Sequence, residues 1–233
     1  MSTRRGQVWI LTCEHGGNEV PPGWAQHFVG AEDVLASHRG WDPGALALLR
    51  HLAPLADATF HATVTRLLVD LNRSERHPRV FSEFTRGLPS SMRTELLDRY
   101  WRPYRDQVAD AVAAALVEHE TVLHLGVHTF TPVLDGEVRD VDIGVLYDPQ
   151  RPVERDWCRA WAAALAEGGP LRVRLNRPYR GAADGLTTAF RRRFGPRYLG
   201  VELEVNQALL VRGRWDARVP ALLEETLSAL RPR

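Results

Sequence analysis

The sequence of 233 residues contains no Lys, so all 30 of its basic side chains belong to Arg. We attribute this mainly to a coding bias, although Arg also has a planar fork that binds carboxylates in a bidentate manner. The Arg residues nearly balance the 29 Asp and Glu residues, and the formal net charge is +1. This balance argues against a nucleic-acid partner, because such proteins carry a strongly basic surface. The run from Arg191 to Arg193 is more simply a solvated helix face.

Cysteine and long apolar runs are also scarce. Cys13 and Cys158 lie far apart and neither has a CxxC partner, which favours reduced thiols over a disulfide framework. No apolar run approaches the ~18 residues of a membrane span. The first residues, MSTRRGQVWILTC, lack the apolar length and cleavage site of a signal peptide. We therefore expect a soluble cytoplasmic protein without a membrane partner, and the oligomeric state stays open.

Repeats, low-complexity tracts and linkers are absent as well, so residues 1–233 are expected to form one domain. Apolar runs, caps and breakers predict strands at 8–11, 59–63, 65–69, 121–127, 142–147, 171–175 and 199–205. They predict helices at 45–53, 91–119, 153–167, 187–194 and 220–230, with Pro103 kinking or dividing the long one. Strands that alternate with helices indicate an α/β fold with a largely parallel sheet covered on both faces.

Two histidines stand at the ends of expected strands. His15, in the stretch CEHGGN, follows the first apolar run and precedes two glycines that leave room around its ring. His128, in GVHTFTP, directly follows the expected strand 121–127. Ligands bind at the carboxyl ends of strands in open α/β sheets, and imidazole is the commonest metal ligand. A single histidine is more often structural, but two at matched positions favour a metal site.

A catalytic zinc site usually has three protein ligands and a water, so a third ligand is needed. Glu14, Glu19 and Asp42 are the acidic candidates. Asp42 has a competing interpretation, because an Asp directly before Pro43 is a typical helix N-cap.

Further polar side chains accompany the apolar segments. Asn72 and Arg73 follow the expected strand 65–69, where they either bind a substrate carboxylate or form a solvated turn. Arg66 lies within that strand, which suggests that it faces a cleft or an ion pair. Glu202 and Glu204 share one face of the strand 199–205, and one of them could be a general base. For Glu202 we favour a structural ion pair.

The polar stretch 74–89 is long for a plain connection and is expected to be a functional loop.

An ordered set of motifs resembles the N-formylglutamate amidohydrolase family, which is similar in turn to the zinc carboxypeptidase and aspartoacylase group. The motifs run from about Cys13 to Gln207 and are CEHGGNxVP, HRGWDPGA, VDLNRS, HPRVFSEFTR, GVHTFTPVLDG, DIGVLYDP, NRPYRG and GVELEVNQ. The resemblance implies a three-layer sandwich of the phosphorylase/hydrolase-like, zinc-peptidase-like type, with helices around a mixed, mostly parallel central sheet. It also implies hydrolysis of an N-acyl amino acid, typically N-formyl-L-glutamate in histidine breakdown.

The same resemblance implies roles for individual residues. His15 and His128 resemble ligands of one Zn²⁺ ion, Asp42 resembles the acidic ligand, and Glu19 is the runner-up. The aspartoacylase-like group has its acidic ligand three residues after the first His, where this chain has Asn18. Glu204 resembles the general base of that group.

The remaining implied residues would bind the small-molecule substrate. Arg66 would polarise the scissile carbonyl, and Asn72 and Arg73 would hold the carboxylate of the amino acid. Arg180 or Arg177 could bind a second carboxylate. The alternatives are a hydrolase of another N-acyl amino acid or small peptide, and a non-catalytic protein that binds a metal or a small molecule.

Overall fold

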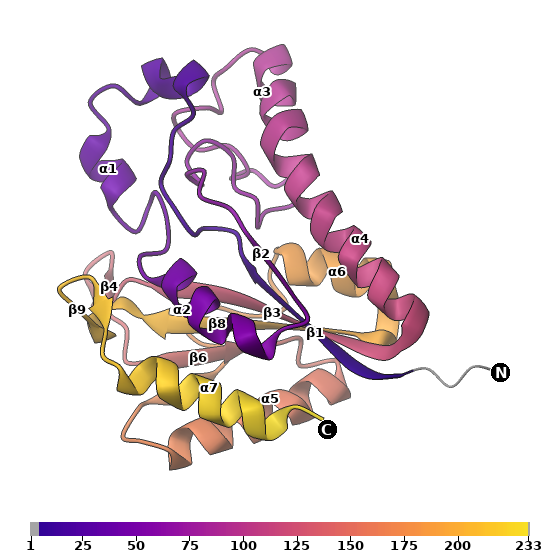
Figure 1. Cartoon of the computed structure of the whole chain (residues 1–233). Coiled ribbons are helices and arrows are strands. Elements are labelled where there is room, and N and C mark those ends of the chain that lie inside the picture. The colour runs from indigo at the N-terminus through magenta and orange to yellow at the C-terminus, as the bar shows by residue number, and fades with distance from the viewer. Residues whose placement is uncertain (1–4, 233) are drawn as a thin grey trace.

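The computed structural model describes residues 5–232, and its centre is a six-stranded sheet with the order β2-β1-β3-β8-β6-β7 (Figure 1). The strands are β1 (Arg5–Cys13), β2 (Ala58–His61), β3 (His119–Phe130), β6 (Ile143–Leu146), β7 (Val173–Leu175) and β8 (Tyr198–Asn206). The first four in the order run parallel, β6 is antiparallel to β8, and β7 is parallel to β6. This mixed, mostly parallel sheet confirms the expected fold class.

Helices cover both faces of the sheet and complete three layers (Figure 1). One face packs against α2 (Ala45–Leu52), α5 (Pro152–Glu167) and α7 (Arg218–Leu230), and the other against α4 (Arg102–Glu118) and α6 (Leu186–Phe194). Alternate side chains of one strand point to opposite faces, so Trp9 and Leu11 enter one core while Val8 and Ile10 enter the other. No helix in the range 5–232 has the length and apolar character to cross a membrane.

The remaining elements are short. They include α1 (Glu32–Ala36), α3 (Ser90–Leu96) and two hairpins, β4–β5 (Val133–Leu134 and Glu137–Val138) and β9–β10 (Leu210–Val211 and Arg214–Trp215). Short 3-10 helices lie at Pro22–Phe28, Ala53–Leu55, Gly195–Arg197 and Gln207–Leu209. The expected long helix at 91–119 is divided, because a π-helical turn at Leu97–Trp101 joins α3 to α4. Pro103 lies in the first turn of α4, where its missing N–H is tolerated.

The prediction of a strand at 65–69 is wrong. Residues 66–68 form a turn, in which the N–H of Leu68 donates to the carbonyl of Thr65 at 3.0 Å. The apolar side chains of Leu67 and Val69 pack in the core beside α4, so the segment is apolar because it is buried. Burial without regular structure produces the same short apolar run as a strand. Arg66 therefore lies in a turn, and Asn72 and Arg73 follow that turn.

The N-cap interpretation of Asp42 is also wrong. The residue that caps α2 is Gly44, whose φ of 86° favours glycine, and the cap makes no side-chain hydrogen bond. A Cβ at Gly44 would lie 2.7 Å from the ring of Trp215. Because Gly44 caps the helix, the carboxylate of Asp42 is available for other contacts.

The position of His128 also differs from the expectation, since it lies within β3 instead of after it.

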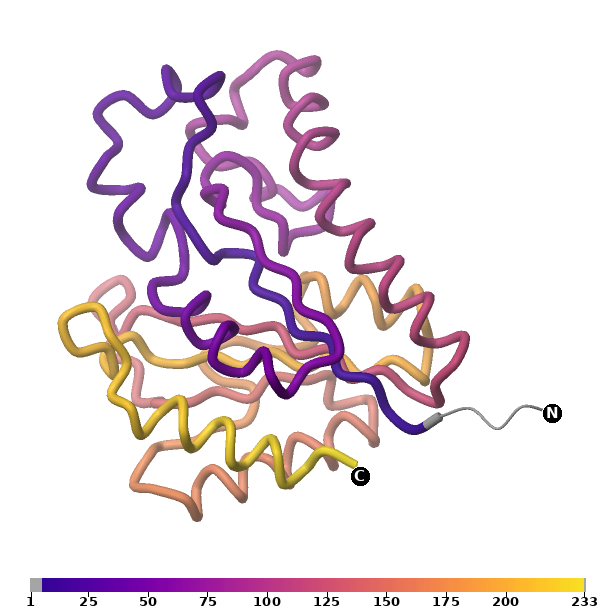
Figure 2. The backbone as a smooth tube through the Cα atoms, in the orientation of Figure 1, coloured from indigo at the N-terminus to yellow at the C-terminus, as the bar shows by residue number. Residues whose placement is uncertain are grey.

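The segment that follows β1 runs beside the segment that follows β2 (Figure 2). The N–H of Gly16 donates to the carbonyl of Ala62 at 3.0 Å, and Glu19 pairs with Val64. A Cβ at Gly17 would lie 2.6 Å from the carbonyl oxygen of Thr63, a separation that real Cβ atoms do not show. The second glycine of CEHGGN is therefore required by this close backbone approach.

We expect Gly17→Ala to lower the free energy of unfolding by about 2 kcal/mol, because the backbone of Thr63 must move away. In a chain of this size such a loss lowers Tm by roughly 5 °C. Gly23→Ala is the matched control, since nothing lies within 4 Å of its Cβ position. Thermal unfolding of both variants checks the prediction, and equal Tm values would contradict it.

Candidate active site

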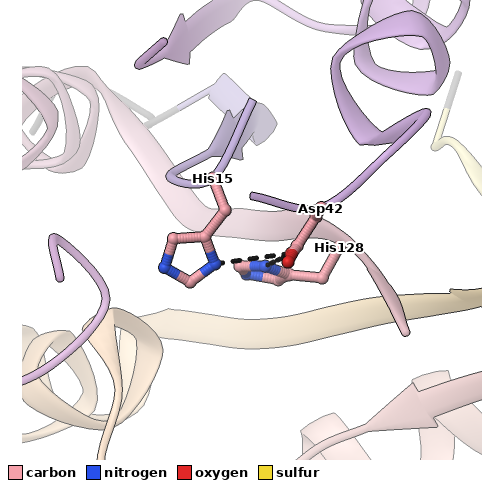
Figure 3. Close-up of side chains that lie close together, drawn as sticks. All are labelled: His15, Asp42 and His128. Carbon is pink, nitrogen blue, oxygen red and sulfur yellow. Dashed lines mark hydrogen bonds and ion pairs between the residues drawn. The ribbon is translucent and has the colours of Figure 1, made fainter. Parts of the chain in front are cut away.

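Three buried side chains meet at the carboxyl end of the parallel strands (Figure 3). His15 comes from the loop after β1, His128 from β3, and Asp42 from the segment before α2. Oδ2 of Asp42 lies 3.4 Å from Nδ1 of His15 and 3.0 Å from Nδ1 of His128. None of the three is more than 4% exposed.

These atoms fit a metal ion. One ligand atom from each residue lies within 4.8 Å of the others, and the set of two imidazoles and one carboxylate is typical of catalytic zinc. Ligands bound at about 2 Å in a tetrahedral arrangement lie about 3.3 Å from one another. The two distances from Asp42 match that spacing. The cluster can therefore hold a divalent cation.

The far nitrogen of each imidazole faces a further carboxylate. Nε2 of His15 lies 2.8 Å from Oδ1 of Asp70, and Nε2 of His128 lies 3.1 Å from Oε2 of Glu14. The carboxylates are buried themselves, and Tyr104 donates a hydrogen bond to the second oxygen of Glu14. Both rings therefore present Nδ1 to the cluster and Nε2 to a carboxylate behind it.

The mutual interactions of these groups shift their pKa values. Burial favours the neutral form of each acid, but the imidazole of His15 and the guanidinium of Arg66 hold the pKa values of Asp42 and Asp70 well below their usual range. Burial likewise opposes the charge of Glu14, yet His128 lowers its pKa to about 2. Burial also disfavours the charged imidazolium of His128, but Asp42 and Glu14 raise its pKa well above the usual value.

Glu204 lies opposite His128, because these two residues are paired in the register of β8 and β3. The side chain of Glu204 is buried, and its Oε2 has no hydrogen-bond partner in the part of the chain that the structure describes. Burial and the nearby charges of Asp42 and Glu202 raise the pKa of Glu204 to about 8, although His128 acts in the opposite direction. An unpartnered carboxylate beside the cluster is suited to accept a proton.

Arg66 bridges two acids at the edge of the cluster. Its Nη1 donates to Oδ1 of Asp42 at 3.1 Å and its Nη2 to Oδ2 of Asp70 at 3.2 Å. Desolvation disfavours the guanidinium, but these two carboxylates raise the pKa of Arg66 further above its usual value. The side chain is still 26% exposed, so one side of it faces the cleft.

The cluster opens into a cleft of about 540 Å³. Its lining includes all eight residues proposed from the sequence, His15, Asp42, Arg66, Asn72, Arg73, His128, Arg180 and Glu204. Two of these residues, Asn72 and Arg73, also bind the backbone around the start of α6. Oδ1 of Asn72 accepts a hydrogen bond from the N–H of Leu186 at the start of α6, and Nη1 of Arg73 donates to the carbonyl of Asp184.

The cleft also distinguishes between the alternatives that the sequence leaves open. Arg180 lines the cleft, whereas Arg177 lines the neighbouring groove beside the hairpin β4–β5. Glu19 accepts a hydrogen bond from Thr63, and Asn18 donates one to the carbonyl of Leu35, so both lie outside the cluster. Glu202 lines the cleft and accepts a hydrogen bond from Thr187, and among residues 5–232 it forms no ion pair of the kind expected with Arg.

Sequence reasoning assigns no role to several residues that the structure brings to the site. Asp70 is part of the motif DLNR, but only the turn at 66–68 reveals that its carboxylate lies behind His15. Arg79, from the expected functional loop, lines the cleft together with His38 and Tyr179. Within residues 5–232, the guanidinium groups of Arg79 and Arg180 have no hydrogen bond or ion pair with another group. The expected functional loop at 74–89 could have indicated Arg79, whereas no sequence pattern indicated His38.

Comparisons with known proteins find one matching family and similar solved structures. The model of the N-formylglutamate amidohydrolase family matches residues 8–211. A gene product of Agrobacterium tumefaciens is 30% identical, with a TM-score of 0.82 over 97% of this chain and 91% of that one. An N-formylglutamate amidohydrolase from Ralstonia eutropha JMP134 is 19% identical, with a TM-score of 0.68 over 97% of this chain and 92% of that one. No curated protein matches.

We expect Asp42→Asn to weaken divalent-metal binding by about 100-fold or more, because the cluster loses the anion shared by its two imidazoles. Competition with a chromogenic chelator measures the affinity for added Zn²⁺. Asp216→Asn is the control, since Asp216 pairs with Arg218 on the surface. Equal affinities of the two variants would contradict the metal site.

Proposed function

Because this chain belongs to the N-formylglutamate amidohydrolase family and is therefore an amide-hydrolysing enzyme, we propose that it converts N-formyl-L-glutamate to formate and L-glutamate with one bound Zn²⁺ ion. The observation that carries the proposal is the position of Glu204, an unpartnered buried carboxylate beside His15, Asp42 and His128. A non-catalytic binding protein does not require an unpartnered buried carboxylate next to its metal site. A place in histidine breakdown depends on this substrate.

The residues of the cluster would hold the ion through the two Nδ1 atoms and Oδ2 of Asp42. A zinc ion bound there supplies Lewis-acid activation of water and of the amide carbonyl. Glu204 accepts a proton from the attacking water and delivers it to the nitrogen of the leaving amino acid. Arg66 faces the cleft with a positive charge that stabilises the developing oxyanion.

Carboxylate recognition follows from the cations of the cleft. The charge of Arg66 is engaged by Asp42 and Asp70, whereas Arg73 donates to a neutral carbonyl and lies 3.9 Å from Asp70. We assign the α-carboxylate of the substrate to Arg73 and the amide nitrogen of Asn72. Arg180, assisted by Arg79, receives the side-chain carboxylate. The guanidinium groups of Arg79 and Arg180 have no partner in the range 5–232, and two such groups in one cleft favour an acidic substrate over a neutral one.

We expect the enzyme to prefer N-formyl-L-glutamate to N-formyl-L-glutamine, which has the same shape but lacks the second charge. Arg180→Ala should reduce kcat/KM for the glutamate substrate by about 10- to 100-fold, the effect of one charged hydrogen bond, and change the glutamine substrate little. Formate release from both substrates measures the preference. Arg177→Ala is the control, because Arg177 lines the neighbouring groove.

The substrate panel includes the N-acetyl and N-succinyl derivatives of glutamate. Hydrolysis confined to N-acetyl substrates would refute the formyl specificity and keep the amidohydrolase activity. An Arg180→Ala variant that loses activity equally on the glutamate and glutamine substrates would refute the role of Arg180 in recognising the charge.

We expect Glu204→Gln to lower kcat by about 10²- to 10⁴-fold, because the glutamine amide cannot accept the proton. Zinc content should stay at the wild-type level, since Glu204 is outside the proposed ligand set. Glu202→Gln is the matched control on the same strand and should lower kcat by less than about 10-fold. Steady-state kinetics with metal analysis separates these outcomes, and equal effects of the two variants would exclude Glu204 as the base.

A further inference from the structure

We propose that Glu14 and Tyr104 are a positioning pair, which holds the ring of His128 so that its Nδ1 atom faces the metal cluster. This inference rests on the cluster being a metal site, but it is independent of the substrate. It concerns residues behind the ligands, and neither member of the pair lines the cleft.

The first step is the choice between the two ring nitrogens of His128. Nδ1 lies 3.0 Å from Oδ2 of Asp42, on the side of the cluster, and Nε2 lies 3.1 Å from Oε2 of Glu14. A ring that binds a metal ion through Nδ1 is neutral and carries its one proton on Nε2, where a neighbouring carboxylate can accept it. Glu14 therefore favours the proton on Nε2, which leaves the lone pair of Nδ1 for the ion.

The contact between Glu14 and His128 is close but bent, since Nε2 makes no well-directed hydrogen bond. The orientation of the Glu14 carboxylate therefore needs a second support. Tyr104 supplies it, because its hydroxyl donates to Oε1 of Glu14 at 2.9 Å. The two oxygens of one buried carboxylate thus contact a ring of the cluster on one side and a helix on the other.

Tyr104 belongs to α4, and its ring packs in the same core as Val108 and Leu97. The hydroxyl is thus fixed by the packing of a long helix against the sheet. The sequence separation of 90 residues between Tyr104 and Glu14 means that the pair forms only in the folded chain. A rigid donor of this kind limits rotation of the carboxylate at little entropic cost.

The other histidine has the same arrangement, which strengthens the inference. Nε2 of His15 lies 2.8 Å from Oδ1 of Asp70, and that oxygen also accepts a hydrogen bond from the N–H of Asn72. The second oxygen of Asp70 accepts from Arg66. Each imidazole is therefore backed by a buried carboxylate whose other oxygen accepts a hydrogen bond, from Tyr104 for Glu14 and from Arg66 for Asp70. A chance contact of a core tyrosine would not reproduce this pattern.

The test uses the full-length protein with its metal removed and then titrated with Zn²⁺ against a competing chelator. Tyr104→Phe keeps the ring and removes only the hydroxyl, and we expect it to weaken zinc binding by about 10- to 100-fold. Tyr198→Phe is the matched control, because its buried hydroxyl contacts Nδ1 of His124 and not Glu14. We expect this variant to bind zinc within about twofold of wild type, since no group behind the ligands is lost.

A spectroscopic measurement separates positioning from general destabilisation. The visible spectrum of bound Co²⁺ reports the geometry of the ligands, and it should change in Tyr104→Phe but not in Tyr198→Phe. Glu14→Gln provides a second variant and should weaken zinc binding at least as much as Tyr104→Phe. If Tyr104→Phe or Glu14→Gln is folded and binds both metals as wild type does, the positioning pair is refuted.

The outcomes also distinguish this inference from the proposed function. A wild-type protein that binds zinc tightly but does not hydrolyse N-formyl-L-glutamate would refute the proposed substrate and leave the pair testable in full. A wild-type protein that binds neither Zn²⁺ nor Co²⁺ would overturn the metal cluster and the positioning pair together.

Discussion

Two buried imidazoles approach the same oxygen of Asp42, and the rest of the site is arranged to make this contact stable. A buried carboxylate without partners would take up a proton. Here the carboxylates of Glu14, Asp42 and Asp70 are kept ionised by His15, His128 and Arg66. Glu204 receives no such partner, so its pKa rises to about 8. A cation at the cluster would lower this pKa, because it favours the nearby charged form, and bring it toward the range in which a general base is effective at neutral pH.

The sheet explains how distant residues reach this point. β1, β3 and β8 are neighbours and run parallel, so their carboxyl ends lie at one edge. The register that pairs His128 with Glu204 places the proposed base next to a proposed metal ligand without any loop between them. Asp42 comes from the segment before α2 and not from a strand. Because Gly44 caps α2 in a left-handed conformation, the carboxylate of Asp42 does not cap the helix and can lie in the cleft. The N–H of Asp42 also donates to the carbonyl of His15, which connects the two segments that carry these residues.

The strand ends could be predicted from the sequence because apolar runs and their polar neighbours are local patterns. These patterns place His15 after β1 and Glu204 within β8, whereas His128 lies inside β3 instead of after it. The family resemblance adds the order of their motifs. Asp42 carried a misleading local signal, since Pro43 suggests a helix cap whereas the actual cap is Gly44. Asp70 could not be placed from the sequence, because the turn at 66–68 that positions it has the apolar composition of a strand. Tyr104 gave no signal at all, because periodicity describes only which face of a helix is buried and not which acid it meets.

At two positions in and near this site, the structure depends on the shape of the arginine side chain. Arg66 uses two nitrogens of one rigid fork for two different acids, Asp42 and Asp70, and still exposes one side to the cleft. The point charge of a lysine lacks the fixed geometry that spaces two carboxylates in this way. The expectation that Arg191 lies on a solvated helix face is wrong, because its side chain is buried. Its fork binds the carboxylate of Glu154 and two backbone carbonyls. At these two positions the fork of arginine makes several directed contacts that the single charge of a lysine would not make.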